Sequence, residues 1–96
     1  MIQRDSRPSS PERGGQSGVV LDVRSRDEFA AGHLSGALNV PVDELETRLS
    51  ELGPPQRPVA VYCRSGRRSA FAAQLLRRAG FVSVTDLGGI LANASR

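Results

Sequence analysis

The stretch VAVYCRSGRRS, residues 59–69, decides the fold. Its first four residues form a continuous apolar run, which is typical of a central parallel strand covered on both faces. A polar loop follows, and a helix is expected from about Ser69 to Ala79, where Gly80 ends it. A buried strand that leads through a short loop into a helix is the basic unit of an α/β domain.

Further elements of the same two kinds are expected on both sides of this unit. Short β-branched or apolar runs predict strands, and segments with capping residues or an apolar stripe predict helices. The strands are expected at 19–23, 38–40 and 82–87, and the helices at 25–29 and 43–52. This alternation predicts an α/β fold with a small, mainly parallel sheet flanked by helices on both faces.

Two of the helices are expected to pack through apolar stripes. In the segment 43–52 the stripe consists of Leu45, Leu49 and Leu52, and in the segment 69–79 it consists of Ala72, Leu75, Leu76 and Ala79. Asp43 and Glu44 at the start of the first helix, and Arg77 and Arg78 at the end of the second, suit the helix dipole.

The chain has room for one domain, which is expected to span residues 19–96. Residues 1–18 are rich in Ser, Pro, Gly and Arg and lack apolar periodicity, so a disordered tail is expected there. This tail has no apolar core of a secretory signal, and no apolar run approaches the roughly 20 residues that span a bilayer. We therefore expect a monomer in the cytoplasm, without membrane contact.

The formal net charge is +3, and all 13 basic residues are arginine. Aromatic residues make up only 4% of the chain, which offers few stacking platforms, so nucleic-acid binding is not favoured. The single cysteine excludes an intramolecular disulfide and a four-cysteine zinc site. Either it is an inert core thiol, or it has chemistry of its own.

The position of Cys63 favours chemistry. It follows the predicted central strand, and ligands of open α/β sheets bind at the carboxyl ends of the strands. Gly66 allows a tight loop whose amides converge at the start of a helix, and this makes an anion site. The helix dipole and Arg64, Arg67 and Arg68 are expected to lower the pKa of the thiol from its ordinary value of about 8.5.

Two reactions suit a thiolate in such a loop. It can attack a sulfur atom and keep it as a persulfide, or it can attack phosphorus, as in a phosphatase or an arsenate reductase. Cysteine-dependent phosphatases carry Cys-x5-Arg, whereas Cys63 and Arg68 form the shorter Cys-x4-Arg. The shorter loop favours sulfur transfer.

Several stretches in this order resemble the rhodanese family over about three quarters of the chain. They are LDVR (21–24) with Glu28-Phe29, GHLSGA (32–37) leading to NVP (39–41), VYCRSGRRS (61–69), and Gly80-Phe81 with LGGI (87–90). The resemblance implies a rhodanese-like fold and a sulfurtransferase that needs no metal or organic cofactor. It further implies that Cys63 is the nucleophile and that Arg64, Ser65, Gly66, Arg67 and Arg68 line the persulfide pocket.

The resemblance also implies the partners. The donor is a small sulfur anion, thiosulfate or a persulfide, and the acceptor is a thiol or cyanide. A carrier that a protein sulfur donor loads is the alternative.

Supporting roles are expected for three further residues. Asp22 and Arg24 end the first strand and are expected to form a buried pair that fixes the loop. Ser69 either donates to the bound sulfur or caps the helix. His33 lies in a predicted turn without a carboxylate placed to orient it, so a structural hydrogen bond is expected rather than a catalytic base.

Overall fold

The computed structural model describes residues 18–90; the predicted tail, apart from Gly18, and residues 91–96 of the predicted domain lie outside them. The strands are β1 (Val19–Asp22), β2 (Leu38–Asn39), β3 (Val59–Cys63) and β4 (Val84–Gly89). The α-helices are α1 (Arg26–Ala30) and α2 (Arg67–Arg78), and the 3-10 helices are η2 (Val42–Thr47) and η3 (Leu49–Leu52). Ser25 caps α1 through a capping box with Glu28.

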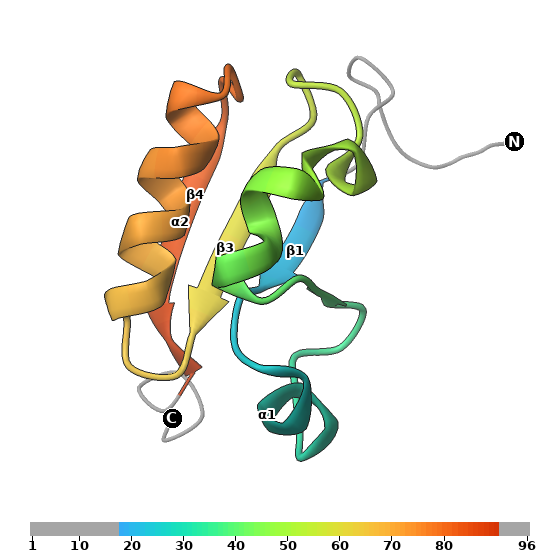
Figure 1. Ribbon diagram of the computed structural model, residues 1–96, viewed down its shortest axis with the longest axis vertical. Helices are drawn as coiled ribbons and strands as arrows, with labels where there is room; N and C mark the ends of the chain where they lie inside the picture. Colours follow the sequence, from blue (N-terminus) through green and yellow to red (C-terminus); the bar gives the residue numbers. More distant parts are fainter. Residues whose placement is uncertain (1–17, 91–96) are drawn as a thin grey trace, which may run out of the picture.

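The four strands form one parallel sheet in the order β2-β1-β3-β4 (Figure 1). β1 and β3 are central, so the predicted central strand is where the sequence places it. Because all the strands run in one direction, their carboxyl ends share one edge of the sheet, and Cys63 lies on that edge. The predicted α/β class with a small, mainly parallel sheet is confirmed.

The two faces of the sheet have different neighbours. The core lies on the face that carries Leu21, Val61 and Cys63, and α2 and the green 3-10 segments lie in front of this face in Figure 1. Asp22 and Tyr62 point to the opposite face and are also fully buried. That face is covered at the carboxyl edge by the connection from α1 to β2, whose Leu34 amide donates to the Tyr62 hydroxyl at 3.0 Å.

The α-helix predicted for residues 43–52 is wrong in type: the segment forms two 3-10 helices that meet at Arg48. The Thr47 hydroxyl donates to the Glu44 carbonyl at 3.0 Å, and the Arg48 amide bonds to Leu45. These hydrogen bonds join residues three positions apart, whereas the backbone bonds of an α-helix join residues four positions apart. The predicted leucines still face inward, since Leu45 and Leu52 are fully buried.

Helix α2 begins two residues earlier than predicted, and its buried stripe is shifted as well. The buried residues are Ser69, Ala72, Ala73 and Leu76, which follow the i, i+3, i+4, i+7 pattern. Leu75 is half-buried and Ala79 is exposed, so these two members of the predicted stripe lie at its edge or outside it. The helix starts at Arg67 because Gly66, with φ +104°, makes the turn out of the loop.

Strand β4 lies two residues later than the predicted 82–87. Phe81 packs into the core, where it is 6% exposed, and Val82 points into solvent. Pairing with β3 therefore starts only at Val84. The register shifts by one residue where Leu87 stands opposite the bond between Val61 and Tyr62. This bulge carries the strand on to pair Gly89 with Cys63.

Candidate active site

The sulfur of Cys63 lies under the loop that joins β3 to α2. The Gly66 amide donates to Sγ at 2.9 Å, closing a tight turn over the sulfur. Gly66 can hold its positive φ without strain because it has no Cβ. The cysteine is fully buried, with the apolar core on one side and the loop amides on the other.

Burial and hydrogen bonding act on this thiol in opposite directions. Burial raises its pKa, but the Ser69 hydroxyl and the amides of Ser69, Gly66 and Ser65 stabilise the thiolate more strongly. The net effect lowers the pKa of Cys63 below its ordinary value. The loop therefore favours the anionic, nucleophilic form of the sulfur.

Ser69 lies beside both the sulfur and the Gly66 carbonyl, and its side chain is fully buried. In this structure its hydroxyl donates to the Gly66 carbonyl at 3.1 Å. A hydroxyl has one proton to donate, so it can serve either acceptor. When the sulfur is anionic it becomes the stronger acceptor, and the same hydroxyl can turn to it without any movement of the backbone.

The other side of the loop rests on β4. A Cβ atom at Gly89 would lie 2.5 Å from the Arg64 carbonyl oxygen and 2.9 Å from the Ser65 Cα, closer than packed atoms can approach. Only glycine lets the strand come this near to the loop. The shape of the loop is thus determined by a residue far from Cys63 in the sequence.

Gly89→Ala is expected to displace the loop. Forcing one methyl group against rigid backbone costs about 1–3 kcal/mol of stability, and the amide of Gly66 moves away from the sulfur. The expected result is a higher pKa of Cys63, measured by the pH dependence of its alkylation. Gly36→Ala is the control, because a Cβ at Gly36 meets nothing within 4 Å and affects only its own turn. Unchanged reactivity of the Gly89→Ala thiol would contradict this account of the loop.

The three arginines of the loop differ in their surroundings. Arg64 and Arg67 are exposed, and neither forms an ion pair with another residue of the described range 18–90. Arg68 points instead to Glu28 of α1, with two hydrogen bonds of 2.8 and 3.0 Å. Glu28 has the sequence signal of a capping box, but nothing in the sequence relates it to Arg68.

The pairing with Arg68, together with the Ser25 amide, lowers the pKa of Glu28 to about 2. A lowered pKa means that the pair stabilises the fold above the ordinary value of 4.5 and loses this effect as the pH falls toward 2. Glu28→Gln should therefore cost about 1 kcal/mol above roughly pH 5 and progressively less in more acidic buffer, since the pair is half-exposed. Urea unfolding at several pH values measures the difference, with Glu46→Gln as the control. A cost that does not depend on pH would contradict the role of the pair.

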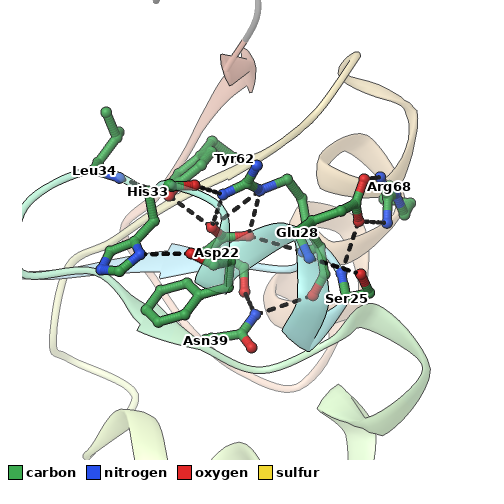
Figure 2. A network of polar contacts seen from close by, with 11 residues as sticks. Asp22, Ser25, Glu28, His33, Leu34, Asn39, Tyr62 and Arg68 are labelled. Carbon is green, nitrogen blue, oxygen red and sulfur yellow. Dashed lines mark hydrogen bonds and ion pairs between the residues drawn. The ribbon is translucent and has the colours of Figure 1, made fainter.

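A buried polar network lies next to the Glu28–Arg68 pair, at the edge of the sheet (Figure 2). Asp22 is fully buried and accepts hydrogen bonds from the Arg24 guanidinium, the shortest at 2.7 Å, and from the Tyr62 hydroxyl at 2.7 Å. The Asn39 amide donates to the carbonyls of Asp22 and Arg24. The Asp22–Arg24 pair and the residues bonded to it thus connect β1, β2 and β3. Tyr62, a member of this network, directly precedes Cys63 in the sequence.

His33 lies on the outside of this region. Its Nδ1 is 2.8 Å from the Phe29 carbonyl, to which it donates, and its ring stacks on the Phe29 ring with centroids 3.6 Å apart. The ring is engaged in local structure. Among residues 18–90 there is no group of three or more His, Cys, Asp or Glu side chains arranged to hold a metal ion.

Comparison with known proteins identifies the family. The profile of the rhodanese-like domain family matches residues 10–93. The chain belongs to this family. The cysteine loop and the parallel sheet described above are therefore parts of a rhodanese-like domain.

Three relatives show what this rhodanese-like chain is similar to. It is 38% identical to the uncharacterized protein YqhL of Bacillus subtilis, over 79% of this chain and 60% of YqhL. It is 34% identical to the thiosulfate sulfurtransferase PspE of Escherichia coli, over 73% of this chain and 68% of PspE. It is 36% identical to the human thiosulfate:glutathione sulfurtransferase, over 73% of this chain and 72% of that protein. The chain thus spans about two thirds of the length of these relatives.

A solved structure agrees with the fold. The rhodanese-like domain of the Anabaena protein Alr3790 superposes with a TM-score of 0.75 and is 35% identical, covering 81% of this chain and 91% of that one. Family membership and the named sulfurtransferases support sulfur transfer as the general chemistry of this rhodanese-like chain. None of the helices between residues 18 and 90 has the length and apolar character needed to cross a membrane.

Proposed function

We propose that this protein carries sulfane sulfur as a persulfide on Cys63, which takes it from thiosulfate or a persulfide donor and gives it to a thiophilic acceptor. The observation that carries the proposal is the thiol of Cys63 beneath the Gly66 amide, in surroundings that favour its thiolate. The relatives named for thiosulfate and for glutathione support this choice of donor and acceptor.

The loading step needs no general base, because the thiolate is the form that the loop favours. The thiolate attacks the outer sulfur of thiosulfate. A new S–S bond forms on Cys63, the S–S bond of thiosulfate breaks, and its electron pair leaves with sulfite. The anionic outer sulfur of the persulfide then lies among the amides that stabilised the thiolate, and the Ser69 hydroxyl can donate to it.

The reduced cysteine is fully buried, so a donor must reach the sulfur through the loop. The exposed loop residues are Arg64, Ser65 and Arg67. Two cations at this surface raise the local concentration of an anionic donor. Their role is attraction at the entrance, and they are therefore expected to affect KM for thiosulfate more than kcat.

The surroundings of Arg68, as well as the length of the loop, disfavour a phosphatase activity. Phosphate transfer needs an arginine whose fork is available to the phosphoryl oxygens. The fork of Arg68 is occupied by the carboxylate of Glu28. The carrier alternative keeps the same Cys63 chemistry but requires a protein donor in place of thiosulfate.

Intact-mass measurement after incubation with thiosulfate tests the proposal. We expect a gain of one sulfur atom, removed again by cyanide with release of thiocyanate. Protein whose Cys63 has first been alkylated is the control and should gain nothing. Loading by a protein persulfide but not by thiosulfate would show the carrier function instead, and hydrolysis of an aryl phosphate without any sulfur gain would overturn sulfur transfer.

A further inference from the structure

An apolar groove of about 330 Å³ lies between residues of α2 and of the 3-10 segments. These elements lie on the core side of the sheet in Figure 1. Its apolar lining consists of Leu49, Phe71, Leu75 and Ala79, and Glu46 and Arg78 complete it. The Phe71 residue is 57% exposed. An aromatic ring left in water beside a hollow is typical of a surface that binds a partner.

The charges at this groove are mainly positive, with Glu46 as the one carboxylate of its lining. Arg67 and Arg78 are exposed on α2, and neither forms an ion pair with any residue between 18 and 90. Arg67 lies four positions before Phe71, so helical spacing puts the two on the same face of α2. A second hollow of about 330 Å³ differs because both of its arginines are paired: Arg26 forms two hydrogen bonds with Glu44, and Arg68 forms two with Glu28.

The lining of the groove starts at Phe71, four residues along α2 from the active-site loop. Arg67 is the first residue of α2, directly after the loop of Cys63. With a rise of 1.5 Å per residue, Phe71 lies roughly 6 Å along the helix from Arg67, and Arg78 roughly 16 Å. A bound extended segment that places a cysteine at the loop therefore reaches Phe71 within about two to four residues.

We propose that this groove docks an acidic segment of a partner protein, which inserts an apolar side chain beside Phe71 and presents a nearby cysteine to the Cys63 persulfide as the sulfur acceptor. The proposal rests on the proposed function and names its acceptor class. Unpaired arginines on both sides of Phe71 complement acidic residues. The chain's own residues 1–17 do not fit this charge pattern, since they carry three arginines against two acids.

The transfer itself is balanced without an oxidant or a reductant. The persulfide on Cys63 takes a proton from water on its outer sulfur, and the partner's thiolate attacks that sulfur. An S–S bond forms on the partner while the bond to Cys63 breaks, and its electron pair stays on Cys63 as the thiolate. The proton remains on the transferred sulfur, so the partner leaves as a persulfide.

Synthetic peptides test the groove. One peptide has a terminal cysteine, a leucine about three residues away and aspartates around the leucine, made with the cysteine at either end. A second set has lysines in place of the aspartates. We expect the thiosulfate-loaded protein to transfer sulfur to the better acidic peptide with a kcat/KM about ten-fold or more above that for its lysine counterpart. Phe71→Ser and Arg78→Glu should each remove most of this advantage and leave transfer to glutathione unchanged.

The controls separate the groove from general effects. Val82→Ser removes another exposed apolar side chain, one that does not line the groove, and should leave the peptide preference intact. Fluorescence anisotropy with a labelled acidic peptide that has serine in place of cysteine measures docking without sulfur chemistry. Binding that Phe71→Ser weakens supports the groove even if Cys63 carries no sulfur. Equal kcat/KM for both peptide sets, or a dimer that Phe71→Ser dissociates in sedimentation, would overturn the proposal.

Discussion

Cys63→Ser is expected to abolish sulfur loading, with a fall in transfer rate of more than about a thousand-fold. The loop can stabilise an anion on Cys63 because a thiol loses its proton easily. A serine hydroxyl in the same place accepts the Gly66 amide but stays protonated, so it neither attacks thiosulfate nor keeps a second sulfur atom. The measurements are thiocyanate production from thiosulfate and cyanide, and the mass of the loaded protein.

The result is informative because the side chains are similar in size. The serine hydroxyl fits the buried site of Cys63, and the variant should remain folded, with a stability cost of about 1 kcal/mol. Thermal unfolding therefore serves as the control for a misfolded protein. No other cysteine exists among the 96 residues. A full sulfur gain in the serine variant would place the chemistry elsewhere and refute the role of Cys63.

Asp22→Asn is expected to cause the largest loss of stability, about 3–5 kcal/mol. Asn keeps the volume of the side chain, but it removes the negative charge that Arg24 needs, and the guanidinium is left in an environment where Arg24 is only 6% exposed. For a domain of this size such a loss lowers the melting temperature by roughly 12–40 °C. Thermal and urea unfolding measure it.

Two comparisons show whether the lost charge is responsible. Asp27→Asn removes an exposed carboxylate nearby and should change stability by less than about 0.5 kcal/mol. Tyr62→Phe removes the hydrogen bond to the Asp22 carboxylate and the one from the Leu34 amide but leaves the charge of Asp22, and should cost about 1–2 kcal/mol. If Asp22→Asn cost no more stability than Tyr62→Phe, the ion pair would not be what stabilises this edge of the sheet.

The sequence predicts the surroundings of Cys63 because the causes are local. An apolar run makes β3, Gly66 makes the turn, and a helix follows directly, so three neighbouring signals place one sulfur at the carboxyl edge of the sheet. The buried face of α2 is less well predicted: its stripe includes Ser69, whose hydroxyl the loop needs, and periodicity of apolar residues alone misses it.

Contacts between distant residues are not visible in the sequence. Arg68 meets Glu28 across 40 positions, and the proximity of Gly89 to Arg64 depends on a bulge that opens at Leu87. In the first 3-10 helix the Thr47 hydroxyl bonds to the Glu44 carbonyl, an acceptor that an α-helix would use for a backbone amide. Each of these depends on how the elements meet in space, and local propensity carries no information about that.

The close approach of Gly89 to the loop also has a consequence for protein synthesis. The chain is synthesised from its amino end, so β4 and its Gly89 are added after Cys63 and the loop. Until that strand pairs with β3, its backbone gives the loop no support from this side. We therefore expect a chain in which β4 has not yet paired to have a less reactive thiol than the complete fold.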